Sequence, residues 1–412
     1  MSLPRRITLV VQRYGREVNG GAEQHARWLA ERLAASAEVT VLTTCALDYL
    51  TWADHYPAGE SDIDGVRVCR YPVDAVRDWK RAQRQTRLVV NHHHTLFDES
   101  RWVHDQGPFS TPLFEAIRRV YETTDAFIFY TFHYATTAFG LPIVSDKAFL
   151  VPTAHDDPFV HMAVFRPLFH LPRGIFYLTE PERRLVQRVT RNGAVANTVT
   201  GVGVEPAVGA SAARFREKFG LAEPFLLYVG RVDESKNVPE LLDFFTRYRQ
   251  AAGTAPLKLV LIGKANMPLP NHPDIVPLGF LPDADRDDAI AAATLVVLPS
   301  LYESLSMITL EAWAGGVPVL VNEQCEVVKY LCRQSNGGLY YRTHDEFTAA
   351  LRLLLGSEAL RWQMGLQGQQ FVLRHYRPEV VLRHYTTLLD AAVRARPSSA
   401  RARQGHEEEA AQ

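Results

Sequence analysis

The chain has 412 residues, of which 45 are basic and 46 acidic, and its formal net charge is −1. Hydrophobic residues make up 47% and charged residues 22%, a globular composition that excludes an intrinsically disordered chain. The balanced charge excludes a general basic field for nucleic acid, so any anion site must be local.

The cysteine content and the N-terminal residues indicate in which cellular compartment the protein is expected. Cys45, Cys69, Cys325 and Cys332 form no Cys-x-x-Cys pair and are too few for a disulfide framework. The apolar run Ile7–Val11 is too short for the hydrophobic region of a signal peptide and predicts a first strand. No run of about 18 apolar residues predicts a membrane-spanning helix. We therefore expect a cytoplasmic protein, whose membrane contact, if any, is peripheral and at the inner face.

Short runs rich in Val, Ile, Leu and Phe alternate with helical patterns. Because these runs are continuous, they indicate strands buried on both faces, as in a parallel sheet. In the first half, strands are expected at Ile7–Val11, Val39–Thr43, Val66–Arg70, Ala126–Tyr130, Ala148–Val151, Gly174–Leu178 and Ala194–Thr198. In the second half, they are expected at Phe225–Val229, Leu257–Ile262, Ile275–Leu278, Leu295–Leu298, Val317–Val321 and Gly338–Tyr341. With helices such as Ala22–Ala34, Pro239–Gln250 and Leu305–Gly315 between them, the order predicts a doubly wound α/β fold.

A break in the pattern divides the chain. Gly201–Ala213 is rich in Gly, Ala and Val, and a new strand–helix series follows it, so we interpret it as a linker. The sequence predicts an N-terminal Rossmann-like domain at 1–205. A C-terminal Rossmann-like domain is expected at 206–385. Residues 386–412 are expected to be the end of a helix and a disordered tail.

A long polar and aromatic segment, Arg77–Phe114, is expected to be an insertion in the first domain. It contains the basic residues Arg77, Lys80, Arg81, Arg84 and Arg87 around Trp79. A solvated helix face is the favoured interpretation; the alternative is contact with anionic lipid or a lipid-linked acceptor. The consecutive histidines at 92–94 point apart and do not predict a metal site.

Three loops that follow expected strands could carry chemistry, because ligands bind at the carboxyl ends of parallel strands. The first contains Gly20-Gly21 directly before a helix, where glycines allow close approach and a helix N-terminus attracts anions. The alternative is an ordinary glycine turn. The second contains Arg231 and Lys236 before a helix that Asn237 is expected to cap, and these two cations could neutralise a diphosphate without a metal.

The third loop contains two carboxylates eight residues apart. Glu303 is expected before a helix and Glu311 within it, so that a small turn would bring both towards one ligand. The free N–H groups of the first helical turn would point at the ligand. They belong to Leu305, Ser306, Met307 and Ile308. A carboxylate accepts two hydrogen bonds, which suits the vicinal hydroxyls of a ribose.

Together these loops resemble the retaining glycosyltransferases of family 4, which have the GT-B fold. The resemblance rests on the Gly-Arg…Lys-Asn loop at 230–237, on Glu-x7-Glu from Glu303 to Glu311, and on the Ala-Trp-Ala-Gly-Gly-Val-Pro-Val run that follows. It covers most of the first domain more loosely, through Gly20-Gly21 and Thr153-Ala-His-Asp. It implies two doubly wound Rossmann-like domains that face each other across a cleft, with 1–205 on the acceptor side and 206–385 binding the nucleotide-sugar.

The resemblance also implies roles for individual residues. Arg231 and Lys236 would bind the diphosphate, Glu311 the ribose and Glu303 the transferred hexose. The backbone around Phe280 and Leu281 would lie near the nucleobase. His155 follows the strand Ala148–Val151 and would lie beside the reacting sugar or the acceptor. Gly20 and Gly21 would lie on the phosphate side of the donor.

In one place the sequence departs from the family pattern. After Glu303 the family often has Gly-Phe-Gly, whereas this chain has Ser304-Leu305-Ser306. This puts in doubt which sugar is transferred. Several Asp-x-Asp patterns, at 62–64, 283–285 and 285–287, are read as polar loops and not as metal sites.

The resulting hypothesis is a metal-independent, retaining transferase without a cofactor. It would move a hexose from a nucleotide diphosphate-sugar to a hydroxyl of a glycan or lipid-linked acceptor, as in polysaccharide biosynthesis. His155, Glu303, Arg231 and Lys236 would act in catalysis. The alternatives are a catalytically silent protein that binds a nucleotide-sugar and a sugar-nucleotide epimerase of the same fold, for which no acid/base set is apparent.

Overall fold

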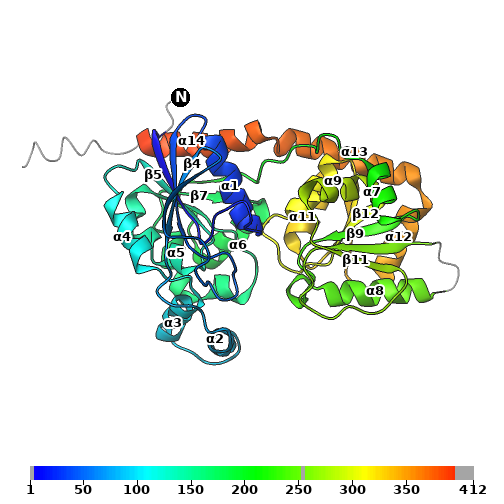
Figure 1. Cartoon of the computed structure of the whole chain (residues 1–412), viewed down its shortest axis with the longest axis horizontal. Helices are drawn as coiled ribbons and strands as arrows, with labels where there is room; N and C mark the ends of the chain where they lie inside the picture. The colour runs from blue at the N-terminus through cyan, green and yellow to red at the C-terminus, as the bar shows by residue number, and fades with distance from the viewer. Residues whose placement is uncertain (1–3, 252–255, 395–412) are drawn as a thin grey trace, which may run out of the picture. The chain divides into compact units, whose positions relative to one another are not determined.

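The computed structural model describes residues 4–251 and 256–394, and these divide into two compact units (Figure 1). The first unit contains residues 4–178, 183–200 and 382–394, and the second contains 179–182 and 201–381. Each unit has a largely parallel sheet covered by helices. The prediction of two doubly wound, Rossmann-like α/β domains is therefore confirmed.

The first unit is built on an eight-stranded sheet in the order β3-β4-β2-β1-β5-β6-β7-β8. The strands are β1 (Arg6–Val10), β2 (Glu38–Thr44), β3 (Gly59–Ile63), β4 (Val66–Tyr71), β5 (Ala126–Tyr130), β6 (Ala148–Val151), β7 (Gly174–Tyr177) and β8 (Asn197–Val199). All pairs are parallel except β3–β4, which form an antiparallel hairpin at the edge. Every residue of β5 and β6 is buried, which explains their unbroken apolar sequence.

Helices of the first unit connect these strands. They are α1 (Gly21–Leu33), α2 (Trp79–Asn91), α3 (Leu96–Gln106), α4 (Thr111–Arg119), α5 (Ala135–Ala138), α6 (Glu180–Thr190) and the greater part of α14 (Pro378–Arg394). Short 3-10 turns are η1 (Leu141–Lys147), η2 (Pro158–His161), η3 (Ala163–Phe165) and η4 (Pro167–Phe169). The segment 77–114 contributes α2 and α3, which form a hairpin, and the first residues of α4.

The second unit contains a six-stranded parallel sheet in the order β11-β10-β9-β12-β13-β14. The strands are β9 (Phe225–Val229), β10 (Lys258–Ile262), β11 (Ile275–Gly279), β12 (Leu295–Leu298), β13 (Val319–Asn322) and β14 (Gly338–Tyr341). The helices are α7 (Ala212–Phe219), α8 (Val238–Gln250), α9 (Asp283–Ala292), α10 (Met307–Ala314), α11 (Glu326–Ser335), α12 (His344–Gly356) and α13 (Glu358–His375), with the 3-10 turn η5 (Glu234–Lys236). Apolar residues of α8 and α12 share one core with the sheet.

Sequence reasoning missed the strand β3. Its sequence, Gly-Glu-Ser-Asp-Ile, lacks an apolar run because four of its five residues are exposed at the sheet edge. Asp62 therefore lies in a strand and not in a loop. The other Asp-x-Asp patterns were also wrongly read as loops, because Asp283, Asp285 and Asp287 lie in α9.

The division of the chain differs from the expected domain ranges in three places, the first being that residues 179–182 group with the second unit. The long segment of the second unit begins at Gly201, within the expected linker, and not at 206. Residues 382–394 of α14 belong to the first unit, because Tyr385 and Leu389 are fully buried and Tyr385 packs against Phe176 of β7 at 4.4 Å between ring centroids. The expected disordered tail, at 395–412, lies outside the described residues. Over 4–251 and 256–394, no helix is both long enough and apolar enough to cross a bilayer.

Candidate functional site

The candidate site of the second unit lies where its strand order reverses. β9 and β12 are neighbours in the middle of the sheet, and the chain winds outwards from them in opposite directions. Ligands of such sheets bind at this switch point, beyond the carboxyl ends of the strands. The loops that follow there are 230–237 after β9 and 299–306 after β12. Both are loops that the sequence predicts to carry chemistry.

Local hydrogen bonds shape the loop after β9. The Tyr228 hydroxyl donates to the Arg231 carbonyl at 2.6 Å, and the Asp233 carboxylate accepts from the Lys236 N–H at 3.2 Å. The Arg231 guanidinium donates to Ser235 Oγ at 3.2 Å and lies 3.7 Å from Asp233. Burial disfavours the ionised Asp233, but the Ser235 hydrogen bond and the Arg231 charge outweigh it and lower the pKa of this carboxyl. The loop thus holds the Arg231 guanidinium beside an ionised carboxylate.

The two loops are joined directly. Lys236 Nζ lies 2.7 Å from Glu303 Oε1, and their side chains are 26% and 17% exposed. The Asn237 amide donates to the Pro299 carbonyl at 3.1 Å. Asn237 stands at the N-terminus of α8 as expected, but its side chain makes no capping hydrogen bond, because its left-handed backbone (φ 55°) directs it to the other loop. Two of the residues singled out in the sequence, 67 positions apart, therefore form one ion pair.

Glu311 lies in the middle of α10, and its partner is a residue that sequence reasoning missed. Arg286 Nη2, from α9, lies 3.7 Å from Glu311 Oε1. Burial raises the pKa of Glu311, and the Arg286 charge opposes this effect. Arg286 is the middle residue of the Asp-Arg-Asp pattern at 285–287. The sequence reasoning considered only the two aspartates of this pattern and did not consider the arginine.

The turn between Glu303 and α10 depends on an unusual backbone conformation. Ser306 adopts φ 84°, a left-handed conformation that favours glycine. Its hydroxyl is 2.9 Å from that of Thr309 in the first turn of α10. The helix therefore begins at Met307 and not at Leu305. Glu303 precedes the helix and Glu311 lies within it, as expected.

The remaining donor-side residues differ in exposure. Leu305 is 3% and Ser306 7% exposed, so both residues are buried. Met307 and Ile308 are half-buried at the start of α10. Phe280 is 65% exposed in the connection between β11 and α9. Leu281 is half-buried beside it.

In the first unit, Gly20 and Gly21 connect β1 to α1. A Cβ atom on Gly20 would lie 2.2 Å from Glu23 Oε2, whereas one on Gly21 would meet nothing within 4 Å. Glu23 is buried and pairs with Arg13 at 2.5 Å. The first turn of α1 therefore already carries a buried carboxylate, which the helix dipole favours. Gly20 leaves room for that carboxylate; the predicted phosphate contact of the glycines stays a prediction.

His155 belongs to a polar group at the carboxyl ends of β5 and β6. Its Nδ1 lies 3.1 Å from Asp157 Oδ2. Burial disfavours the ionised Asp157, but the His155 hydrogen bond and charge outweigh it and lower the pKa of this carboxyl. His133, after β5, is strongly desolvated, which lowers its pKa to about 4.

Backbone strain marks the same place. Thr131 and Thr153 both have positive φ, 63° and 51°, and their hydroxyls are 3.1 Å apart. Strained non-glycine residues cluster at functional sites. Sequence reasoning found His155 but missed Asp157 and His133, although both follow strands whose carboxyl ends meet at one edge of the sheet.

Comparison with known proteins bears on the same parts of the chain. Residues 211–371, which contain all the donor-side residues of the second unit, match the model of the family described as glycosyl transferases group 1. A lipopolysaccharide core biosynthesis glycosyltransferase of Rhizobium meliloti, LpsE, is 27% identical over 107 residues, which are 26% of this chain and 31% of LpsE. The matched segment spans about a third of the length of the curated relatives.

Solved structures match nearly the whole chain. Sucrose-phosphate synthase from Thermosynechococcus elongatus superposes with a TM-score of 0.70 at 16% identity, covering 95% of this chain and 100% of the synthase. Anabaena HepE in complex with UDP-glucose superposes with a TM-score of 0.66 at 12% identity, covering 94% of this chain and 98% of HepE. At these identities the likeness shows the fold alone, and that fold is GT-B.

Proposed function

We propose that this protein is a retaining glycosyltransferase that moves a hexose from a nucleotide diphosphate-sugar to a hydroxyl group of a glycan or glycolipid. One observation carries the proposal: Lys236 and Glu303 meet at 2.7 Å where the central strands of the second unit end, with Arg231 in the same loop as Lys236. This arrangement places two cations and a carboxylate at the position where parallel sheets bind their ligands.

The chemistry of the donor explains why these residue types are needed. Breaking the anomeric C–O bond leaves negative charge on the departing diphosphate. Arg231, Lys236 and the N–H groups at the start of α10 would stabilise that charge without a metal. Glu303 would then exchange its contact with Lys236 for hydroxyl groups of the hexose. The acceptor hydroxyl would attack on the leaving-group face, so that configuration is retained and the diphosphate takes the proton.

Glu311 would bind the nucleoside. A carboxylate accepts hydrogen bonds from both hydroxyls of a ribose. Arg286 supports this role because its positive charge favours the ionised form of the half-buried Glu311. The exposed Phe280 and the neighbouring Leu281 follow β11, the strand at the edge of the same sheet, and would lie near the base.

The comparisons support the donor class and the acceptor class to different degrees. HepE, which shares the fold, has been solved with UDP-glucose, and this supports a nucleotide-sugar as the donor. LpsE, which matches 26% of this chain, acts in lipopolysaccharide core biosynthesis, and this supports a glycolipid or polysaccharide acceptor. We propose that the Gly20-Gly21 turn contacts the phosphate side of the donor and that His155 contacts the reacting sugar or the acceptor.

The proposal is tested by two substitutions on the full chain. Titration with UDP-, GDP- and ADP-sugars, monitored by calorimetry, first identifies the donor, and release of nucleoside diphosphate then measures turnover. Lys236→Ala should weaken donor binding about 10- to 100-fold, because it removes a charge-assisted contact. Glu303→Ala should lower turnover at least about 100-fold. Lys218→Ala is the matched control, since Lys218 forms an ion pair with Asp285 and lies in α7, outside the loops 230–237 and 299–306.

The outcomes separate the alternatives. If both variants bind and turn over donor as the wild type does, the site assignment is wrong. If the wild type binds a donor at this site but releases no nucleoside diphosphate with any acceptor or with water, the protein is a silent nucleotide-sugar-binding protein. Turnover that is abolished by a chelator and restored by a divalent metal would contradict the metal-independent mechanism.

A further inference from the structure

The helices α2 and α3 form an antiparallel hairpin, residues 79–106, at the outer edge of the first unit (Figure 1). Trp102 anchors it: the indole stacks on Phe159 with ring centroids 4.7 Å apart, and its N–H donates to Thr86 Oγ1 at 2.9 Å. The Glu99 carboxylate accepts from the Val164 N–H at 2.7 Å. The hairpin is thus held firmly on its inner side, and the proposed sugar-transfer site makes no use of its outer side.

The outer side of α2 carries a basic stripe. Lys80, Arg84 and Arg87 are spaced four and three residues apart, which places them on one face of the helix. All three are exposed, and none forms an ion pair with another described residue, whereas Arg81 pairs with Asp105 at 2.7 Å. Cations that are not neutralised within the protein are available to an external anion.

Apolar side chains project around the turn that joins the two helices. Phe97 is 73% and Leu96 58% exposed in the first turn of α3. Leu88 and Val90, in the last turn of α2, are 37% and 36% exposed. Clustered exposed apolar side chains at the end of a rigid element mark an interaction site and not ordinary surface. We call these four residues the apolar tip.

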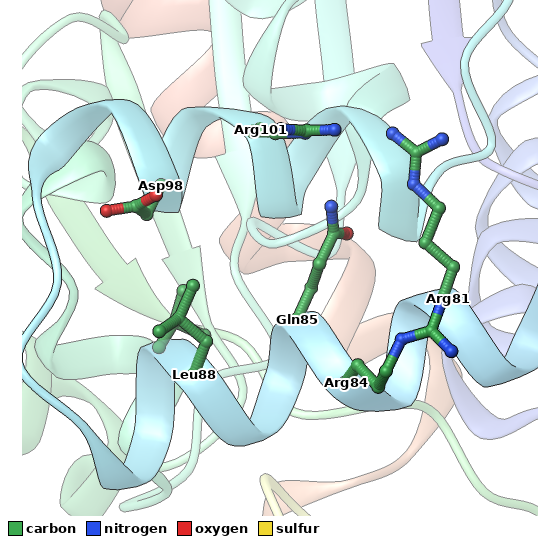
Figure 2. Close-up of a pocket in the computed structure, with 7 residues that line it drawn as sticks. Arg81, Arg84, Gln85, Leu88, Asp98 and Arg101 are labelled. Carbon is green, nitrogen blue, oxygen red and sulfur yellow. The ribbon is translucent and has the colours of Figure 1, made fainter.

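A groove between the helices brings the two features together. Its volume is about 360 Å³ and it is lined by Arg81, Arg84, Gln85, Leu88, Val89, Asp98 and Arg101. Figure 2 shows Arg81 and Gln85 of α2 directed towards α3, and Leu88 beside Asp98 near the tip. Three guanidinium groups thus border a concave surface with Leu88 and Val89 in its wall. Arg81 and Arg101 both lie within 4 Å of the Asp105 carboxylate, so Arg84 supplies the charge that the protein leaves uncompensated there. This chemistry fits an anionic headgroup with a hydrocarbon chain beside it.

We propose that the α2–α3 hairpin binds the surface of a membrane that contains anionic phospholipid. The apolar tip enters the interface, the stripe lies against the headgroups, and the groove receives a lipid phosphate. Basic residues on the polar face and apolar residues beside them are what an interfacial helix requires. A nucleic acid or another soluble polyanion would use the cations but would leave Phe97 and Leu96 in water. The proposal does not depend on the sugar-transfer reaction.

The test is sedimentation of the full chain with vesicles of phosphatidylcholine alone and vesicles of equal parts phosphatidylcholine and phosphatidylglycerol. The wild type should bind the anionic vesicles at least about tenfold more tightly. The stripe variant Lys80→Gln/Arg84→Gln/Arg87→Gln and the tip variant Leu96→Ser/Phe97→Ser should each lose about tenfold in affinity. Only the stripe variant should also lose the salt dependence.

Matched controls make the same chemical changes elsewhere. Arg333→Gln/Arg352→Gln/Arg374→Gln removes three exposed charges from the second unit, and Trp362→Ser removes a side chain that is 66% exposed. Both should bind as the wild type does. All substituted hairpin residues are exposed, so circular dichroism and thermal unfolding should match the wild type.

Three results would overturn the proposal. The first is that the wild type binds neither kind of vesicle or binds both with equal affinity. Another is a pair of hairpin variants that bind as tightly as the controls. The third is loss of binding in the stripe variant but not in the tip variant, together with equal affinity of the wild type for an RNA homopolymer, which would assign the hairpin to a soluble polyanion.

Discussion

His25 illustrates, at the scale of a single residue, how burial makes a side chain sensitive to pH. It lies in α1, 2% exposed, with its Nε2 atom 3.1 Å from the Tyr385 hydroxyl and its ring edge-on to Tyr130 at 5.3 Å. Burial lowers the pKa of His25 to about 3 and is the main cause of the lowered pKa of His133, about 4. Both rings are therefore neutral in the folded protein near neutral pH.

The lowered pKa values of His25 and His133 determine how the free energy of unfolding changes with pH. In the unfolded chain a histidine has a pKa of about 6.5, so the unfolded state takes up protons first as the pH falls. The contribution of each neutral buried histidine to the free energy of unfolding is fully present above about pH 6.5 and falls as the pH drops below that value. At pH 5 the protonation of each histidine in the unfolded state should lower the free energy of unfolding by about 2 kcal/mol. The His25→Gln variant should therefore lose about 2 kcal/mol less than the wild type between pH 7.5 and pH 5, measured by urea unfolding.

A second substitution provides the comparison for this prediction. His92→Gln, at an exposed position of the α2–α3 turn, should leave the pH dependence as it is in the wild type. An unchanged slope in the His25 variant would show that the buried ring is protonated without loss of the fold.

At the scale of single elements, the packing of α10 determines where Glu311 points. Leu310, Ala312, Trp313 and Ala314 are all buried, so this short helix is enclosed on most sides. Its neighbour α13 approaches closely because it has glycine at Gly365 and Gly368. Gln369 of α13 also donates to the Ala314 carbonyl at 3.0 Å, which satisfies a free group at the end of α10.

This close approach predicts the effect of one methyl group. A Cβ atom on Gly365 would lie 1.8 Å from the Gly316 carbonyl oxygen, so that Gly365→Ala must push α13 away from α10. We expect a loss of about 2 kcal/mol in the free energy of unfolding, although alanine is the better helix former. Gly356→Ala, which would meet nothing within 4 Å, should be neutral or slightly stabilising in the same denaturant titration.

Donor binding by the Gly365→Ala variant tests whether this packing also positions Glu311. If the variant weakens donor binding as well as stability, the orientation of α10 positions Glu311 for the donor. A variant with full stability would show that the α10–α13 contact adjusts to the extra methyl group.

For the molecule as a whole, truncation before residue 382 should destabilise the first unit, because residues 382–394 of α14 belong to that unit. Ending the chain after Val381 removes Tyr385 and Leu389 from the core of the first unit, together with the hydrogen bond from Arg173 to the Ala392 carbonyl. Each buried side chain contributes about 1.5–3 kcal/mol, so the first unit should lose at least about 3 kcal/mol. The loops of the second unit keep their own contacts, and nucleotide binding should remain.

Two chain lengths test this expectation. A chain ending at Arg394 keeps all of α14 and should unfold as the full chain does, whereas the chain ending at Val381 should show an early transition in urea. Equal stability of both would contradict the assignment of residues 382–394 to the first unit.

The sequence by itself determined the two α/β domains and the loops that matter. Strands buried on both faces have continuous apolar sequences, and the carboxyl end of a strand fixes where the following loop lies. For this reason the loops that contain Arg231, Lys236 and Glu303 could be placed at the ends of β9 and β12 from the sequence, whereas their role in binding a donor stays a prediction. The same rule failed for β3, whose exposed edge position leaves no apolar signal.

Only the tertiary structure decided which residues meet. Arg286 and Glu311 are far apart in the sequence, and it is the packing of α9 and α10 against one sheet that brings them to 3.7 Å. The packing of α14 on the first unit is also decided by tertiary structure. The sequence of an amphipathic helix shows which face is apolar, but it does not show which core that face packs against. Periodicity reports which side of an element is buried; the partner is chosen by packing between elements distant in the chain.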